Sequence, residues 1–139
     1  MSMASRSTRI GAWMYRRMNG RGMGGSKDAP VVMLTTPGRR TGEPRSTCVR
    51  AIRLPDGYLV WGTGSGSPRD PDWVRNLRAA GETELQVHAE RMHASARELA
   101  GDERDLVWND VVLAKLPRVA KYARKAGRTI PVAVLKPVA

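Results

Sequence analysis

Apolar and polar residues alternate along much of this chain, and the alternation predicts a largely antiparallel sheet. Apolar residues recur at every second position, or form short runs, in six segments: 31–36, 46–54, 58–61, 83–87, 91–99 and 130–135. Turn residues such as Pro55-Asp56-Gly57 join neighbouring segments directly. Because parallel strands need long crossover connections, this arrangement favours an antiparallel sheet or small barrel of the mainly β or α+β class.

The first helix that the pattern predicts is short, basic and amphipathic. Between residues 6 and 18, apolar side chains recur at helical spacing, while arginines fall largely elsewhere around the helix. The apolar positions are Ile10, Trp13, Met14 and Met18. Such a helix suits an anionic membrane surface, with Trp13 at the level of the headgroups. It also suits packing on the domain's own core or on the partner copy of a homodimer, and both uses stay open.

Two further helical regions are expected between the strands. Asp70-Pro71 predicts a helix start, with Asp70 as the N-cap and Pro71 in the first turn. A later region from Asp102 to Gly127 begins with carboxylates, which favour a helix N-terminus, and is interrupted at Pro117. These helices are therefore expected to flank the sheet rather than to alternate with every strand.

Composition agrees with one domain and points to an anionic partner. The 139 residues are 41% apolar, which is enough for one core, and we divide them into a helix with a glycine-rich lead-in at 1–29 and a single barrel domain at 30–139. Lys and Arg number 24 against 13 Asp and Glu, a formal net charge of +11. This excess favours a phosphorylated cofactor, nucleic acid or an acidic membrane face. One cysteine and no long apolar run favour the cytoplasm, with membrane association on its inner face as an addition.

Two loops carry the strongest signal for a ligand. The basic loop, residues 35–45, combines bend residues with Arg39, Arg40 and Arg45, and follows an apolar strand. The glycine loop, residues 62–69, follows another strand and leads into the helix that starts at Pro71. Guanidinium groups, backbone amides and a helix N-terminus all favour anions. The pair therefore predicts a site for an anionic cofactor, unless both are ordinary solvated turns.

Other chemistries find less support in the sequence. His88 and His93 are the only histidines and lack convergent acidic ligands, so no metal site is expected. Cys48 has no nearby base, and a packed or cofactor-adjacent thiol is expected rather than a nucleophile. Nucleic-acid binding rests on charge alone, since no recognition helix or aromatic platform is present. No Ser-His-Asp order with elbow glycines indicates a hydrolase.

Four segments taken together resemble the deazaflavin-dependent nitroreductase family. They are Trp13–Arg17, Leu34–Arg45, Pro71–Leu77 and the Gly127–Val132 ending, and the match runs from about Trp13 to Val138. The resemblance implies a six-stranded split β-barrel of the FMN-binding type. It also implies binding of reduced coenzyme F420, an 8-hydroxy-5-deazaflavin that bears a phosphodiester and an oligoglutamate tail. Such a polyanion suits the positive charge of the chain.

The family's contacts, carried over residue by residue, assign each loop a part of the cofactor. The phosphate and tail contacts fall on Arg39, Arg40, Thr41 and Arg45, with Arg69 as a further contact. The ring contacts fall on Cys48, Val49, Arg50, Gly62, Thr63, Gly64, Trp73 and Asn76. The implied reaction is direct hydride transfer from ring carbon C5 to a hydrophobic acceptor stacked on the ring.

Departures from the family concern the acceptor. Arg50 stands where characterised members carry a tyrosine, and Leu116 and Val119 replace two of three spaced tyrosines, which leaves Tyr122. Arg50 could polarise a carbonyl, and Thr63 or Tyr122 could donate a proton. The expected activity is an F420-dependent reductase of a quinone, an enone or a nitroaromatic. The alternative is a non-catalytic protein that binds or carries a deazaflavin or a lipid.

Overall fold

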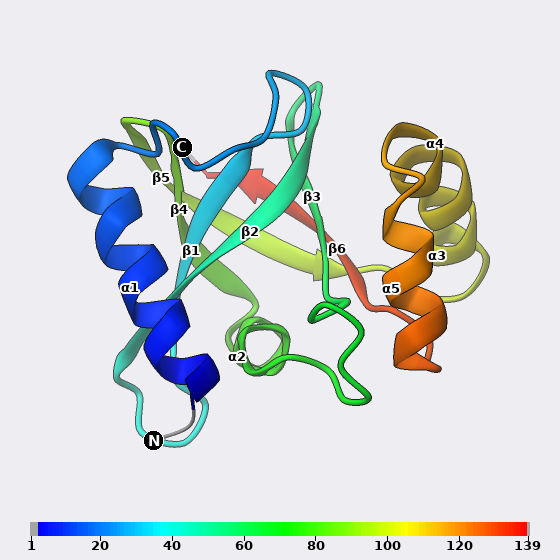
Figure 1. The fold of residues 1–139 in the computed structure, drawn as a ribbon, viewed down its shortest axis with the longest axis horizontal. Coiled ribbons are helices and arrows are strands. Elements are labelled where there is room, and N and C mark those ends of the chain that lie inside the picture. The colour runs from blue at the N-terminus through cyan, green and yellow to red at the C-terminus, as the bar shows by residue number, and fades with distance from the viewer. Residues whose placement is uncertain (1–2, 139) are drawn as a thin grey trace.

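Six antiparallel strands close into a barrel in the computed structural model, which describes the backbone of residues 3–138 and the side chains of residues 9–138 (Figure 1). Neighbouring strands follow the order β1-β2-β3-β6-β5-β4. The strands are β1 (Val31–Pro37), β2 (Pro44–Leu54), β3 (Gly57–Trp61), β4 (Glu82–Val87), β5 (Glu90–Glu98) and β6 (Val132–Pro137). The strands expected from the alternation, and the antiparallel barrel with flanking helices, are confirmed.

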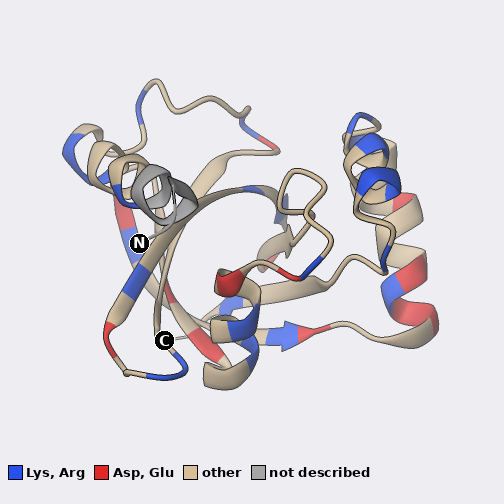
Figure 2. Ribbon diagram, turned by 60° about the horizontal axis from the view of Figure 1, so that its bottom comes forward, with Lys and Arg blue, Asp and Glu red and all other residues tan. Residues whose placement is uncertain are grey.

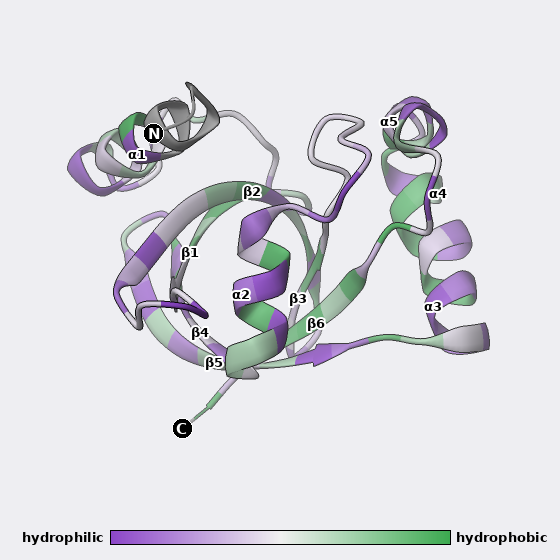
Figure 3. Cartoon of the chain, turned by 90° about the horizontal axis from the view of Figure 1, so that it is seen from below, coloured by the Kyte–Doolittle hydropathy of each residue, from purple (hydrophilic) through white to green (hydrophobic). Residues whose placement is uncertain are grey.

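The helices cover two sides and one end of this barrel. They are α1 (Met3–Met18), α2 (Asp72–Ala80), α3 (Gly101–Val107), the π-helical segment η1 (Trp108–Val112), α4 (Leu113–Lys115) and α5 (Val119–Ala126). Figure 3 looks into the ring of strands and shows α2 across its mouth, α1 on one side, and α3, α4 and α5 on the other. The glycine loop lies between α2 and α5 in this view.

Alternation along the strands supplies two separate apolar clusters. In β3, Tyr58 and Val60 belong to the cluster inside the barrel, which Leu77 of α2 closes. The next residues, Leu59 and Trp61, belong to a cluster outside the barrel. The outer cluster is completed from the later helices and the start of β6 by Trp108, Val112, Ala126, Ile130 and Val132. Because both faces of β3 are covered, all five of its residues are buried.

Helix α1 packs on the sheet through a face that its apolar pattern did not predict. Ala12 and Tyr15 are 2% and 0% exposed, whereas Ile10 and Trp13 are 60% and 61% exposed. The Tyr15 hydroxyl donates to the backbone oxygen of Val31 at 2.9 Å and accepts from a backbone amide of the β4–β5 turn at 2.8 Å. The expected packing of the apolar side on the domain's own core is wrong, because Tyr15 satisfies backbone groups at the barrel wall. The domain division at residues 29 and 30 stays a prediction.

Helix α2 starts without the side-chain cap expected from Asp70. Its N-cap is Pro71, with no side-chain hydrogen bond, and Asp70 binds Arg78 and Arg128 instead. A carboxylate that pairs with two guanidinium groups gains more than it does from a single backbone amide, so the expected cap is wrong. The expected C-terminal caps are confirmed, since Gly81 and Gly127 have φ of 71° and 65° in the left-handed region.

Candidate functional site

The basic loop is a tight turn between β1 and β2 that is closed by its own backbone. The Gly38 amide donates to the Glu43 oxygen, and the Gly42 amide donates to the Gly38 oxygen, both at 2.8 Å. Gly42 has φ of 77°, which favours glycine at this bend. The Thr41 hydroxyl accepts from the Glu43 amide at 3.2 Å. The loop therefore has a defined shape within the described residues.

Arg39 fastens the basic loop to α2. Its backbone amide and its Nη1 both donate to the side-chain oxygen of Asn76, at 3.1 and 2.9 Å. Its Nη2 lies 3.2 Å from a carboxylate oxygen of Asp72. Asn76 is 5% exposed, so its buried amide oxygen is satisfied by this contact. Arg39 and Asn76, both expected at the cofactor, come together in the structure, and the charge of Arg39 is balanced by Asp72.

Arg40 and Arg45 keep their guanidinium groups at the surface. Arg40 is exposed, and the Arg45 side chain is 46% exposed with Glu43 3.9 Å away. A surface ion pair at that distance contributes little, and it leaves most donors of Arg45 to solvent. Figure 2 shows basic segments spread over α1, α2 and α5 as well. The two arginines are therefore a local offer of positive charge within a generally basic chain.

The glycine loop owes its glycines to close packing. Gly64, Ser65 and Gly66 have φ of 54°, 55° and 90°, three left-handed residues in succession. A Cβ at Gly62 would lie 2.5 Å from a methyl carbon of Val74, and one at Gly66 would lie 2.6 Å from the Lys125 side chain. We expected these glycines to let a ligand approach the backbone. The described contacts show that they let α2 and α5 approach it.

Arg128 holds the glycine loop and was missed by the sequence analysis. Its side chain donates to the backbone oxygens of Gly62, Thr63 and Ser67, at 3.0 to 3.2 Å. It also pairs with Asp70 at 2.9 Å. The signal was present, because Arg128 belongs to the Gly127–Val132 ending that carried part of the resemblance. Nothing in its local sequence says which loop it reaches.

The three expected catalytic residues gather around the glycine loop. Ala51 pairs with Val60 in the β2–β3 register, so Arg50, one residue earlier on β2, lies where β3 gives way to the loop. Arg50 is exposed, and its Nε donates to the backbone oxygen of Ala29 at 2.5 Å. Thr63 belongs to the loop itself. Tyr122 is half-buried on α5, one turn before the residue that packs against Gly66.

Cys48 and Val49 point to opposite faces of β2, as neighbours in a strand must. Val49 packs against the barrel interior. The Cys48 thiol lies under α1 and donates to the Gly11 oxygen at 3.6 Å. Burial raises its pKa to about 11, although Arg16 acts in the other direction. The thiol is protonated near neutral pH, which agrees with a packed side chain rather than a nucleophile.

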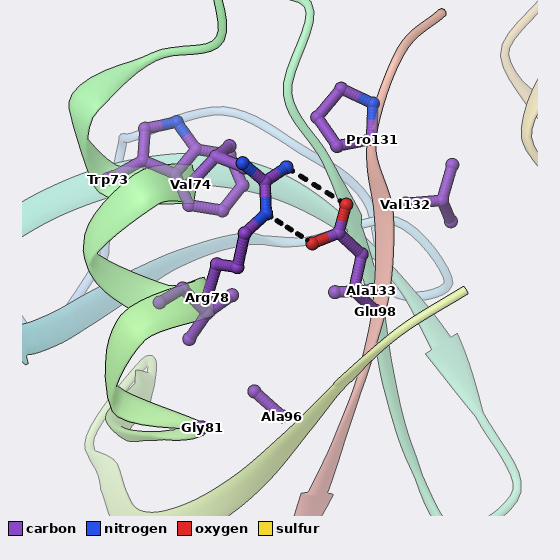
Figure 4. Close-up of a pocket in the computed structure, with 10 residues that line it drawn as sticks. Trp73, Val74, Arg78, Gly81, Ala96, Glu98, Pro131, Val132 and Ala133 are labelled. Carbon is purple, nitrogen blue, oxygen red and sulfur yellow. Dashed lines mark hydrogen bonds and ion pairs between the residues drawn. The ribbon is translucent and has the colours of Figure 1, made fainter. Parts of the chain in front are cut away.

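Trp73 lies in an apolar cavity on the side of α2 away from the basic loop (Figure 4). The cavity has a volume of about 80 Å³, and its apolar walls include Val74, Ala96 and Pro131. Arg78 and Glu98 form a two-pronged ion pair there, with distances of 2.6 and 2.9 Å. This strong pair raises the pKa of Arg78. Arg69 is exposed on the glycine loop, with its amide bonded to Ser67.

Comparisons with known proteins agree on one family. The family model for F420H(2)-dependent quinone reductase matches residues 7–137. An F420H(2)-dependent quinone reductase of Mycobacterium tuberculosis is 33% identical over 125 residues, which cover 88% of this chain and 84% of the relative.

Solved structures give the same result at the level of the fold and of the cofactor named in a title. A structure titled F420-H2 dependent reductase (FDR-A) matches with a TM-score of 0.67 and 29% identity, over 77% of this chain and 94% of that one. A second structure, titled a domain-swapped dimer, matches with a TM-score of 0.69 and 27% identity, over 89% of this chain and 97% of the other. The expected dependence on a reduced deazaflavin is confirmed at the family level. This chain belongs to the F420H(2)-dependent quinone reductase family of oxidoreductases, whose cofactor is coenzyme F420.

Proposed function

We propose that this chain transfers a hydride from reduced F420 to a quinone at the site between the basic loop and the glycine loop. The observation that carries this placement is the contact of Arg39 with Asn76, which fixes the basic loop against the helix that follows the glycine loop. F420 has a polyanionic end and a flat ring. An exposed group of arginines beside a packed loop fits both parts of such a molecule.

The basic loop fits the anionic end of the cofactor. Arg40 and Arg45, exposed and weakly paired, bind the phosphodiester and the glutamate carboxylates in this proposal. The Thr41 hydroxyl adds a polar contact. Arg39 contributes chiefly by holding the loop, since Asp72 balances its charge. Arg69, exposed on the neighbouring loop, is the further contact with the tail.

The ring belongs beside the glycine loop. When bound there, the reduced deazaflavin supplies the hydride. The proposed ring contacts are Gly62, Thr63, Gly64, Arg50, Trp73 and Asn76. Cys48 and Val49 stay predictions as ring contacts, and their side chains are packed under α1 and inside the barrel. The protein's part is to orient the ring and the acceptor and to keep water away from them.

Arg50, Thr63 and Tyr122 are the residues proposed to act on the acceptor. The described hydrogen bond of Arg50 uses Nε, and its Nη groups are then available to polarise a quinone carbonyl. A reduced quinone oxygen also needs a proton, which the hydroxyl of Thr63 or Tyr122 can donate. A guanidinium at Arg50 suits an oxygen acceptor, and this favours a quinone over a nitroaromatic.

Fluorescence titration followed by turnover tests this function. F420 is titrated into the purified protein, and reduced F420 is then mixed with menadione or with a nitroaromatic while deazaflavin absorbance is followed. We expect saturable binding and oxidation by menadione. Saturable binding without oxidation by either acceptor supports the non-catalytic carrier instead. Absence of binding contradicts both functions.

Substitutions separate the acceptor residues from the cofactor residues. Arg50→Met is expected to lower kcat with menadione by about 100-fold, because it removes the group that stabilises charge on the quinone oxygen. Arg50→Lys is expected to keep part of the rate. Thr63→Val and Tyr122→Phe each remove one hydroxyl, and the one that lowers kcat identifies the proton donor. In every case the dissociation constant for F420 should change less than kcat, and the opposite order would assign the residue to the cofactor.

We further propose that α1 contacts an anionic membrane surface on the inner face. Ile10, Trp13, Met14 and Met18 form an exposed apolar side, between 39% and 61% exposed. Arg9 and Arg17 are exposed on the same helix, with Arg17 5.9 Å from the Trp13 ring. Basic residues around an apolar face match an anionic lipid surface. None of the helices within residues 3–138 has the length and hydropathy needed to span a bilayer.

Flotation with liposomes tests the membrane contact. Trp13→Ser is expected to reduce recovery with phosphatidylglycerol vesicles, while Leu106→Ser, at a site that is 62% exposed on α3, serves as the matched control. Deleting α1 would instead uncover the Tyr15 contacts, so a point variant is cleaner. Equal recovery of both variants contradicts the proposal. A dimer mass that Trp13→Ser abolishes would assign this face to a homodimer.

A further inference from the structure

Arg128 is unusual among the arginines of this chain because every nitrogen of its guanidinium group is used on one loop. Nε donates to the Ser67 oxygen at 3.1 Å, and Nη2 donates to the oxygens of Gly62 and Thr63 at 3.0 and 3.2 Å. Nη1 pairs with Asp70 at 2.9 Å. The side chain is 15% exposed. One planar group therefore joins both ends of the glycine loop.

Asp70 extends this contact into a chain of four charges. Its second oxygen lies 3.2 Å from Nη2 of Arg78. Arg78 in turn holds Glu98 of β5 through two hydrogen bonds, as the dashed lines in Figure 4 mark. The order Arg128–Asp70–Arg78–Glu98 links the segment after α5 to the glycine loop, to α2 and to the barrel wall. The loop is thereby anchored to three elements that do not themselves bend.

The glycine loop needs such an anchor because its own bonds are few. Within the loop, the Gly66 amide donates to Thr63 and the Ser67 amide donates to Gly64. Gly64, Ser65 and Gly66 all have positive φ, and glycines in particular reach many other backbone conformations when nothing holds them. Three carbonyl oxygens converge on Arg128 only when the loop adopts its present shape. A rigid, five-donor guanidinium group is suited to select that shape.

We propose that Arg128 is a positioning residue, which presets the glycine loop in the form that receives the deazaflavin ring. This inference rests on the proposed role of the glycine loop. Arg128 acts through the loop, since its donors are occupied by Gly62, Thr63, Ser67 and Asp70. A preset loop spares the cofactor the entropic cost of ordering it, so affinity and orientation both depend on Arg128.

The chain offers a matched control in Arg104. This arginine is 13% exposed, and its Nε and Nη2 both donate to the backbone oxygen of Ile130, two residues from Arg128. Its guanidinium lies 5.1 Å from the Trp108 ring. It anchors α3 to the same segment, and none of its described hydrogen bonds reaches the glycine loop. Arg104→Met and Arg128→Met therefore remove comparable buried anchors with different targets.

Hydrogen exchange on the cofactor-free protein gives the first readout. Arg128→Met is expected to speed exchange of the amides in residues 62–69, because the three carbonyls lose their shared donor. Arg104→Met should leave this segment protected. Arg128→Lys, which keeps the charge but offers a single ammonium group, should give intermediate exchange and provides a variant that folds if Arg128→Met does not. Unchanged exchange in both Arg128 variants overturns the proposal.

Affinity and turnover give the second readout. We expect Arg128→Met to raise the dissociation constant for F420 about tenfold and to lower kcat, with the KM for menadione nearly unchanged. Arg104→Met should leave all three near the wild-type values at the same temperature. An equal loss of F420 affinity in both variants, or faster exchange with unchanged affinity and kcat, overturns the positioning role. Wild-type protein that fails to bind F420 contradicts the proposed function itself, and is recognised before any variant is compared.

Discussion

The basic loop and the glycine loop use arginine in opposite ways. The basic loop carries three arginines of its own, and two of them, Arg40 and Arg45, remain exposed. The glycine loop carries only Arg69, but its shape depends on Arg128, which comes from the far side of α5 and is largely buried. One loop presents charge, and the other is held by it.

This difference shows that arginine content does not by itself locate an anion site. An exposed guanidinium group keeps its donors for a ligand. A buried one has given its donors to backbone oxygens and carboxylates, and its charge is balanced before a ligand arrives. Arg39 stands between these cases, because it belongs to the basic loop but is bonded to Asn76 and Asp72. The comparison can be tested through its two halves separately.

Removing the exposed pair should have the largest effect on binding. Arg40→Ala with Arg45→Ala is expected to raise the dissociation constant for F420 about 100-fold, because each charge-assisted hydrogen bond contributes roughly 1.5 kcal/mol or more. The unfolding midpoint in urea should hardly change. Arg91→Ala with Lys136→Ala removes the same charge from exposed sites on β5 and β6, and should leave affinity nearly intact. Equal weakening by both pairs would reduce the basic loop to general electrostatics.

Breaking the link between the basic loop and α2 should cost stability as well as affinity. Asn76→Ala leaves the Arg39 amide without its acceptor, and we expect a loss of about 2 kcal/mol in the free energy of unfolding. Asn76→Asp keeps an acceptor oxygen at the same place and should lose much less. Urea unfolding measures both, and comparable losses would show that the contact is not the cause.

The packing requirement of the glycine loop can be separated from its backbone conformation. Gly66 and Gly24 both have positive φ, 90° and 86°, but only a Cβ at Gly66 would meet another residue, Lys125 at 2.6 Å. Gly24→Ala should therefore cost about 1 kcal/mol, and Gly66→Ala about 1 kcal/mol more. Chemical unfolding of the two variants measures the difference. Equal costs would mean that α5 yields to the loop.

Salt should produce the smallest of these effects and should act on one loop only. Raising the salt concentration from about 50 to about 200 mM is expected to weaken F420 binding several-fold, because exposed charges are screened. The variant without Arg40 and Arg45 should lose most of this dependence. Hydrogen exchange in residues 62–69 should change little, since the Arg128 contacts are shielded from solvent. Salt-sensitive exchange there would contradict the division between the two loops.

Local patterns were sufficient to predict the strands and the ends of several helices. Alternation in β3 separates Tyr58 and Val60 from Leu59 and Trp61, because side-chain direction in a strand has a period of two. Gly81 and Gly127 end their helices because left-handed φ favours glycine. The ligand chemistry of the basic loop could also be predicted, since bend residues and arginines lie together in the sequence.

Only the tertiary structure decided which partner each long side chain found. Helix α1 has an obvious apolar stripe, yet it packs through Ala12 and Tyr15, because the Tyr15 hydroxyl meets backbone groups of the barrel. Asp70 stands at an expected N-cap position, yet it pairs with arginines from α2 and from beyond α5. Such pairings depend on closure of the barrel. The sequence by itself determined where this chain bends and where it carries charge, and the closed barrel determined which charges were left for a ligand.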